Sequence, residues 1–527
     1  MLVDNIKDLP PWVWVVGIVI LALGRALSFR YQKGLSRFNG PFLASFTNFW
    51  RFWQALYHWD RVTYPDVLKY GKVIRLGPDT LLFSEPDAIK DIYTTGFSKS
   101  DQYRVAAGVS KGQIVANIFS TTNKEWHGRL RRAVSNAFAL STLVQYEPLV
   151  TKTLSTFLRV AHRDFADKPG EAGIVDFSQY SRFIALDVIS ELTFGTPYGL
   201  LEAGRDNIGI TKGRTGFKRY AHLVYNVSWV DNVLYKNPIL LWLGRMGWYN
   251  KVTATVPFAQ KQIFARHAAL RDTKKAEDLG RVGGKGSVDL LTKFLQAKVD
   301  YPEVVDDRAV LGLTLSMVNA GSGTIATTFS GIIYYLLKSP VVMNKLMAEL
   351  DAHFPPPQSP ISTSFEDWVV PFGEAQKLPY LDACIKETFR IHPSLGGQLM
   401  ERLTPPEGAI IAGEHIPGGI RVSSNAWLVH RHKPTYGHDV EVFRPERWLD
   451  CDSQQLSAMN SALLVFGAGP NTCIGKNIGL LELYKMIPTT LRMFKIEQVD
   501  SNASWKIFNL GDPEPYDFFV RFTSRYR

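Results

Sequence analysis

The sequence predicts a mainly α-helical fold with a small β region, preceded by one N-terminal transmembrane helix. Long stretches repeat apolar residues with helical spacing, whereas the alternation that is typical of strands is sparse and local. An apolar run near the N-terminus is long enough to cross a bilayer. With 527 residues, the rest of the chain can bury a large core with an internal cavity.

The composition narrows the class of protein. Hydrophobic residues make up 46% and charged residues 21%, which argues against disorder, fibrous repeats or several membrane spans. The net charge of +11 favours an anionic membrane or an acidic protein partner, and because no basic stripe with interleaved aromatics occurs, no nucleic acid is expected. Three scattered cysteines (Cys384, Cys451 and Cys473) are too few for a disulfide framework, so we expect a cytosolic domain.

The N-terminal apolar run extends from Leu9 to Phe29. As a helix, its 21 residues would span roughly 30 Å, the thickness of a hydrocarbon core. Basic residues cluster at its C-terminal end, which predicts a lumenal N-terminus and a cytosolic remainder. A cleaved signal peptide is the alternative, but the residues before the run are not predominantly basic. We therefore expect a membrane anchor over residues 1–30 and one folded domain over residues 31–527.

The clearest strands form a predicted hairpin. Val73 to Leu76 and Leu81 to Phe83 are rich in apolar residues and flank the turn Gly77-Pro78-Asp79. Elsewhere helical spacing dominates. We expect this hairpin to belong to the small β region.

Two later stretches carry charged pairs with helical spacing. His127 and Arg131 stand at i and i+4, and Glu387 and Arg390 at i and i+3, so each pair shares a helix face. Solvated pairs of this kind are common. Neither pair predicts a site by itself.

A long apolar segment without proline covers residues 306–338 and predicts one helix of roughly 50 Å. Its middle contains Gly321 and Gly323, followed by Thr324. Each glycine costs about 1 kcal/mol relative to alanine inside a helix, so a close approach or a local opening is expected there. Helix packing could also explain the glycines, and Thr324 could simply donate a hydrogen bond to the carbonyl of Ala320.

The segment from Phe466 to Gly475 combines a glycine-rich loop with a cysteine and precedes an amphipathic run. We therefore expect Cys473 at the start of a helix, where backbone N–H groups and the helix dipole favour the thiolate, the form that binds metals. Gly469 and Gly475 would let the backbone and a cofactor approach closely. These residues alone leave open a structural cysteine, a catalytic nucleophile and a heme ligand.

The spacing F-G-x-G-x-x-x-C-x-G in this segment resembles the heme-binding loop of the cytochrome P450 family. The resemblance implies the cytochrome P450 fold and heme b, with Cys473 as the axial thiolate of the iron. Phe466 would screen the sulfur from water, and Gly469 and Gly475 would complete the cofactor loop. Most members hold a heme propionate with Arg or His two residues before the cysteine, but Asn471 stands here and donates without charge.

The pair Glu387 and Arg390 resembles the E-x-x-R element of the same family. Pro445-Glu446-Arg447-Trp448 is similar to its P-E-R-F element. The resemblance implies a buried lock of Glu387, Arg390 and Arg447 that fixes the cysteine loop and takes no part in the chemistry.

Further basic residues match positions that bind heme propionates in the family. Arg402 matches one such arginine. His127 and Arg131 resemble the W-x-x-x-R element, with His in place of Trp. Counting from Trp126 gives an alternative register, but Leu130 would then occupy the arginine position.

The residues Ala320 to Thr324 resemble the A-G-x-D-T element, which implies that heme lies between this helix and the Cys473 loop. Thr324 would then hydrogen-bond dioxygen and steer protons to it. The acid that usually precedes the threonine is Gly323 here, so Ser322, water or a polar substrate group could take its role. The departure leaves open a heme-thiolate isomerase or dehydratase.

By this resemblance, the expected activity is that of a monooxygenase that inserts one oxygen atom from O2 into a hydrophobic small molecule. The pattern is most similar to fungal microsomal members of secondary metabolism, which implies the endoplasmic reticulum membrane. NADPH-cytochrome P450 reductase would supply electrons and dock near Arg129, Arg132 and Lys476. A non-catalytic heme-binding protein is the alternative from another class, because Asn471 and Gly323 depart from the family pattern.

Substrate contacts are expected in three segments, residues 115–119, 394–398 and 508–511, which are mostly apolar. They indicate an apolar pocket and do not identify the substrate.

Overall fold

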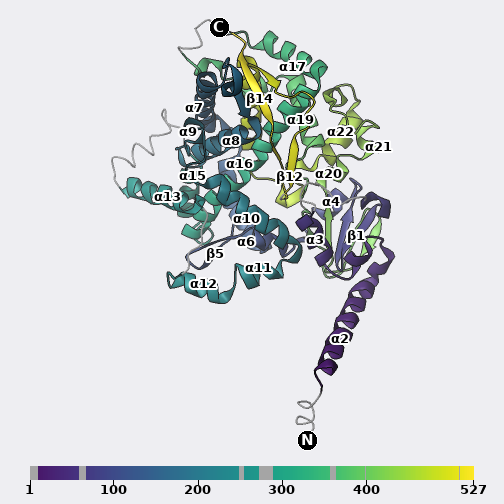
Figure 1. Ribbon diagram of the computed structural model, residues 1–527. Helices are drawn as coiled ribbons and strands as arrows, with labels where there is room; N and C mark the ends of the chain where they lie inside the picture. The colour runs from purple at the N-terminus through teal and green to yellow at the C-terminus, as the bar shows by residue number, and fades with distance from the viewer. Residues whose placement is uncertain are drawn as a thin grey trace.

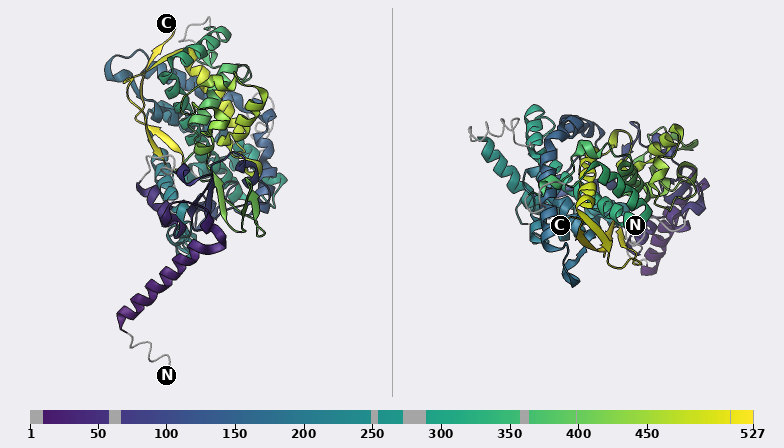
Figure 2. Two further views of the ribbon diagram at one scale, coloured as in Figure 1. Left: turned by 90° about the vertical axis from the view of Figure 1, so that its right-hand side faces the viewer. Right: turned by 90° about the horizontal axis from the view of Figure 1, so that it is seen from above.

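The computed structural model describes residues 10–57, 67–248, 254–271, 289–356, 364–397, 399–509 and 511–526. Helices make up most of the molecule, the small sheets are spread among them, and a single helix projects from one end (Figures 1 and 2). The predicted mainly α fold with a small β region is confirmed.

The helices of the described residues are α2 (Pro11–Tyr31), α3 (Phe49–Tyr57), α4 (Ala88–Ile92), α5 (Gln102–Val105), α6 (Lys124–Val134), α7 (Leu140–Asp164), α8 (Phe177–Phe194), α9 (Leu200–Ala203), α10 (Ile210–Val224), α11 (Trp229–Leu234), α12 (Pro238–Arg245), α13 (Thr255–Arg271), α15 (Leu290–Asp300), α16 (Asp307–Lys338), α17 (Pro340–His353), α18 (Phe372–Ala375), α19 (Pro379–Ile391), α20 (Ala426–Val429), α21 (Lys433–Tyr436), α22 (Ser453–Ala462) and α23 (Lys476–Met493).

The strands are β1 (Val73–Gly77), β2 (Thr80–Phe83), β3 (Ser98–Lys99), β4 (Gly108–Ser110), β5 (Gln113–Val115), β6 (Ile174–Asp176), β7 (Arg402–Leu403), β8 (Ala409–Ile411), β9 (Glu414–Ile416), β10 (Arg421–Ser424), β11 (Phe494–Gln498), β12 (Lys506–Asn509), β13 (Pro513–Tyr516) and β14 (Phe519–Ser524).

The long helix α16 runs through the core. The side chain of its N-cap residue Asp306 accepts a hydrogen bond of 2.8 Å from the Ala309 N–H, which fixes the start of the helix. Its apolar residues pack against α8, which is buried along nearly its whole length. The helix predicted over residues 306–338 is therefore confirmed as a single element that spans the domain.

The helix α2 projects from the domain (Figure 1). Most of its apolar side chains are exposed, including Trp12 and Leu21. Two described helices are long and apolar enough to cross a membrane, namely α2 with its extension to Arg37 and α16, but α16 is mostly buried inside the domain. The N-terminal helix is therefore the one compatible with a membrane anchor. Leu9 and the charged residues that precede it lie outside the described residues.

A five-stranded sheet with the order β1-β2-β10-β7-β3 lies beside the base of α2. The predicted hairpin forms its edge, with Ile74 opposite Leu82 and Arg75 opposite Leu81. Strand β10 joins β2 in parallel and then pairs antiparallel with β7. Through β7 and β3, the sheet brings Arg402 next to Lys99.

The C-terminal strands return to the core. Strands β11, β14 and β6 form one sheet, and β12 and β13 form a separate hairpin. Strand β13 contacts both α16 and α8. Residues near the C-terminus thus reach the middle of the long helix.

Candidate active site

Cys473 lies in the loop between the 3-10 turn Leu464–Phe466 and α23, two residues before the N-cap residue Gly475. Its backbone N–H donates to the Phe466 carbonyl at 2.8 Å, which closes the loop. Burial raises the pKa of the Cys473 thiol, while the Gly475 N–H and the charges of Arg131 and Lys476 act to lower it. The predicted position near a helix start agrees with this geometry.

The Cys473 side chain is exposed although protein surrounds it closely enough for burial to raise its pKa, so its sulfur faces an internal hollow. Asn319 and Ala320 are likewise exposed in the middle of the otherwise buried α16. The two elements meet nearby, since a Cβ at Gly479 on α23 would lie 3.3 Å from Ile325 Cδ1 on α16. A flat prosthetic group inserted between them would cover these exposed atoms, so the hollow fits heme.

The aromatic ring of Phe466 packs edge-on against Phe389 with centroids 5.4 Å apart, and the ammonium of Lys476 lies 5.7 Å from its centroid. Phe466 is therefore held beside the cysteine loop by α19. Asn471 ends the short turn Gly469–Asn471 and is partly buried.

The two glycines of the loop differ in what requires them. Gly469 has a φ of +64°, and a Cβ there would lie 1.7 Å from the carbonyl oxygen of Tyr93. The backbone of Tyr93 therefore requires this glycine, which is the close backbone approach that the sequence predicted. At Gly475 the nearest atom to a Cβ is Cys473 Sγ at 3.9 Å, so its lack of a side chain leaves the sulfur accessible.

Four basic residues lie close together, and their charges shift the pKa of two of them. Burial and then the charges of Lys99, Arg131 and Arg402 together lower the pKa of His127 to about 4. Burial, Arg402 and Arg131 likewise lower the pKa of Lys99 to about 7. Arg402 also donates to the Tyr103 hydroxyl at 2.5 Å. The structure thus brings His127, Arg131 and Arg402 together, as the resemblance implied.

Lys99 is the member of this group that the sequence did not predict. Its ammonium donates to the carbonyls of Ile118 and Phe119 at 2.7 and 2.9 Å, and none of the causes of its pKa shift is a carboxylate. Its Cα pairs with that of Arg402 across strands β3 and β7. Because this pairing joins residues far apart in the chain, no local pattern could have revealed it.

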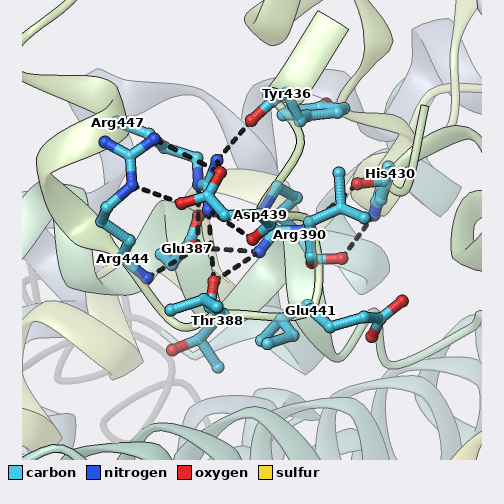
Figure 3. Close-up of polar contacts among 12 residues, drawn as sticks. Glu387, Thr388, Arg390, His430, Tyr436, Asp439, Glu441, Arg444 and Arg447 are labelled. Atoms are coloured by element: carbon cyan, nitrogen blue, oxygen red, sulfur yellow. Dashed lines mark hydrogen bonds and ion pairs between the residues drawn. The ribbon is translucent and has the colours of Figure 1, made fainter. Parts of the chain in front are cut away.

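The predicted lock is assembled as Figure 3 shows. Glu387 accepts hydrogen bonds from Arg390 Nε at 2.9 Å and Nη2 at 2.8 Å, and from Arg447 Nε at 3.0 Å. It also accepts from Trp448 Nε1 at 3.0 Å and from the Arg444 N–H at 2.9 Å. The side chains of Glu387 and Arg390 are fully buried. The carboxylate therefore has several donors in place of water, as a buried charge requires.

His430 connects this lock to the cysteine loop. Its Nδ1 lies 3.2 Å from the carbonyl oxygen of Arg390, and its Nε2 accepts from the Leu464 N–H at 2.8 Å. Burial lowers the pKa of His430 to about 3, so the ring is neutral with its proton on Nδ1. Leu464 begins the turn that leads to Phe466 and Cys473. Sequence reasoning missed this histidine because its partners are both backbone groups.

On α16, the Thr324 hydroxyl donates to the Ala320 carbonyl at 2.8 Å, and the residue is partly exposed. Ser322 is fully buried, and its hydroxyl has no hydrogen-bond partner among the described residues. Residues two apart on a helix point roughly 160° apart, so Ser322 lies on the opposite face from Thr324. Ser322 is therefore poorly placed for the proton transfer that the sequence suggested.

A cavity of about 610 Å³ opens between α3, α10 and the β12–β13 hairpin. Leu56, Leu223 and Phe508 contribute apolar surface to it, and Glu514 and His222 contribute polar atoms. Phe508 belongs to a segment predicted to contact substrate. The segments 115–119 and 394–398 do not line this cavity, and Gln398 and Leu510 lie outside the described residues.

Comparison with known proteins agrees with this geometry. The profile of the family described as Cytochrome P450 matches residues 68–516. A cytochrome P450 monooxygenase of Aspergillus terreus is 33% identical over 94% of this chain and 96% of its own length. Cytochrome P450 monooxygenase cicH of Emericella nidulans is 32% identical over 94% of this chain and 95% of its own length. Cytochrome P450 monooxygenase mfmA of Annulohypoxylon moriforme is 30% identical over 96% of each chain. The chain therefore belongs to the cytochrome P450 family of monooxygenases.

Proposed function

We propose that this monooxygenase hydroxylates or similarly oxidises a hydrophobic small molecule of fungal secondary metabolism. The exposed sulfur of Cys473 opposite the exposed turn of α16 is the observation that carries this proposal. The cavity with apolar lining supports a hydrophobic substrate. The fungal relatives that are named as monooxygenases support the type of reaction.

The cofactor is heme b, with its iron bound by Cys473. When bound, heme supplies the activation of O2 that allows an unactivated bond to be oxidised. Lys99, His127, Arg131 and Arg402 would hold the two propionates, because the charges of Arg131 and Arg402 lower the pKa of both Lys99 and His127 and an anion would relieve this repulsion. They supply the charge that Asn471 lacks.

The other residues of the site would shield the Cys473 sulfur, bind the oxygen substrate and fix the cysteine loop. Phe466, held by Phe389, would shield the sulfur from water. Thr324 would exchange its hydrogen bond to Ala320 for one to the oxygen substrate and pass a proton on. Glu387, Arg390 and Arg447 would fix the loop through His430.

Electrons would come from NADPH-cytochrome P450 reductase, docking on the basic surface formed by Arg129, Arg132 and Lys476. Arg132 and Lys476 are exposed, and Arg129 is partly exposed with Glu303 at 3.6 Å. Reversing the charge of Arg132 and Lys476 should slow electron transfer and weaken its dependence on salt. An unchanged rate would contradict docking at this surface.

The protein would be held in the endoplasmic reticulum membrane by residues 1–30, with the N-terminus in the lumen and residues 31–527 as the cytosolic catalytic domain. The exposed apolar face of α2 supports this arrangement.

The test compares Cys473→Ala with Cys451→Ala as the matched control, because Cys451 is partly buried and lies outside the loop. The control should give the ferrous carbon monoxide spectrum of a thiolate-bound heme and oxidise substrate with reductase, NADPH and O2. Cys473→Ala should lose both properties. Turnover of the control without NADPH and O2 would instead indicate an isomerase or dehydratase, the alternative that Gly323 favours.

A further inference from the structure

The space beside Gly323 is filled by charge from another part of the chain. A Cβ at Gly323 would lie 1.7 Å from Arg214 Nη2 and 3.0 Å from Glu514 Oε1. Any side chain at this position of α16 would therefore collide with the guanidinium. The acid that precedes the threonine elsewhere in the family is missing from α16, but a carboxylate lies next to its position.

Glu514 belongs to a buried ionic cluster that joins three elements. Arg214 Nη1 on α10 donates to Glu514 Oε1 at 2.8 Å, and Arg182 Nη2 on α8 donates to its Oε2 at 3.2 Å. Lys218, one turn after Arg214, contacts both Glu514 and Asp512, and Arg214 Nη2 lies 3.5 Å from Asp512. These five residues supply three positive and two negative charges.

Such a cluster is costly to build. Removing charges from water costs several kcal/mol per ion, and well-packed apolar residues often stabilise a fold equally well. Arg214 and Asp512 are only 6% and 8% exposed, so this cost applies here. A role beyond stability is the better explanation for charges placed against the middle of α16.

Glu514 also has access to water. It lines the 610 Å³ cavity together with Thr215, His222 and Tyr516. Its other side faces Gly323, the residue before Thr324. Glu514 therefore lies between an open cavity and the residue that directly precedes Thr324.

We propose that Glu514, held by Arg214, passes protons from the cavity to the Thr324 hydroxyl and so replaces the acid that α16 lacks. The proposal rests on the proposed function. Thr324 would pass its hydroxyl proton to the oxygen substrate, and the Glu514 carboxylate would relay a proton from water to the Thr324 oxygen, directly or through one water molecule. Each proton would come from water in the cavity, so Thr324 and Glu514 would end the step in their starting protonation states, and the relay itself would move no electron.

The neighbouring charges are compatible with this path. Burial raises the pKa of Asp512, whereas Lys218, Arg214 and Arg182 lower that of Glu514 below its ordinary value. Two linked carboxyl groups with pKa values that are driven apart are suited to holding and transferring a proton. Glu514, whose pKa is lowered, would be the carboxylate that relays the proton.

The test is Glu514→Gln, with Asp517→Asn as the matched control. Asp517 is a carboxylate of the same chain segment that pairs with Lys506 at the surface. Both variants should retain the thiolate-heme spectrum, so a failure of the proposed function would be recognised separately. Glu514→Gln should yield less product per NADPH than the control, by a factor of about 10 or more. The missing electrons should be recovered as peroxide.

A second measurement does not depend on activity. Because the pKa of Glu514 is lowered in the folded state, its charge stabilises the fold above the unfolded pKa, and this contribution is lost as the pH falls. The thermal midpoint of ferric Glu514→Gln should therefore fall below that of wild type near neutral pH and converge with it in acid.

Adding Gly323→Asp to Glu514→Gln should restore coupling, because Arg214 is a flexible side chain that can move aside and pair with the new carboxylate. Gly323→Ala in the same background should not restore it. The double variant Arg214→Gln/Glu514→Gln removes one charge of each sign and should also be uncoupled. Wild-type coupling in either folded variant without a carboxylate at this position would overturn the proposal.

Discussion

Lys99 and Arg402 are paired across antiparallel strands, an arrangement that is unfavourable for like charges. Burial together with the charges of Arg402 and Arg131 lowers the pKa of Lys99 to about 7. Residues that destabilise the empty protein are expected where a bound anion later compensates for them. The two propionates of heme would be that anion.

We expect Lys99→Met to have opposite effects on the empty protein and on the heme complex. Lysine with a lowered pKa destabilises the fold increasingly as the pH falls from 10.5 to about 7, so the variant should raise the unfolding temperature of the apoprotein at neutral pH. Heme affinity should fall about 10-fold, or 1.4 kcal/mol. Lys124→Met, an exposed lysine on α6, should change neither. A loss of apoprotein stability in Lys99→Met would contradict this account.

Glu482 gives a second prediction from buried charge. It is 1% exposed on α23, both of its carboxylate oxygens have no hydrogen-bond partner among the described residues, and burial raises its pKa well above the ordinary value. The buried Glu482 carboxyl is tolerated in its protonated form. Its contribution to stability is therefore complete below the pKa it has in the unfolded chain, and it is lost as the pH rises toward the higher pKa of the folded protein. Thermal midpoints of Glu482→Gln and wild type should therefore coincide near pH 4 and diverge in favour of the variant as the pH increases. Glu497→Gln, an exposed control, should show no such divergence.

At the scale of elements, local patterns predicted the β1–β2 hairpin, α16 and the Cys473 loop. Each depends on residues that are close in sequence, such as the turn at Gly77 or the apolar repeat of α16. The contacts that complete the site were not predictable in this way. Lys99 meets Arg402, and Glu514 meets Gly323, only because the strands β3, β7 and β13 reach distant partners. For Ser322, the family pattern gives the position along the helix and not the face on which the side chain lies.

The lock joins α19 to the segment that precedes the cysteine loop, so its loss should affect both stability and heme retention. In Glu387→Gln the two buried guanidinium groups of Arg390 and Arg447 would lose their anion, which should cost about 3 to 5 kcal/mol in the free energy of unfolding. Chemical denaturation would measure this cost.

The matched control for the lock is Arg444→Gln. Arg444 pairs with Asp439 at 2.6 Å but is 41% exposed, so its loss should cost about 0 to 1 kcal/mol. Equal losses in Glu387→Gln and Arg444→Gln would show that the lock contributes no more than a surface ion pair. Faster heme loss in Glu387→Gln alone would connect the lock to the loop through His430.

At the scale of the whole molecule, the anchor and the catalytic domain are not separate at residue 30. Arg75 in the first strand of the sheet is 1% exposed and donates to the carbonyls of Phe29 and Arg30 at 2.7 Å each. It also donates to the Pro78 carbonyl at 2.7 Å. The last turn of α2 therefore supplies acceptors for a buried charge of the domain and fixes the direction in which the helix leaves it.

This contact predicts where the anchor can be removed. Deleting residues 1–24 should release the protein from membranes and leave its stability unchanged, because both carbonyl acceptors remain. Deleting residues 1–31 removes both acceptors and should lower the free energy of unfolding by about 2 to 3 kcal/mol. Chemical denaturation and sedimentation with vesicles would measure the two properties. Because Arg75→Met removes the charge that needs these acceptors, the difference between the two truncations should shrink in that background to the part due to Arg30, whose guanidinium donates to Ser45. An undiminished difference would contradict the role given to Arg75.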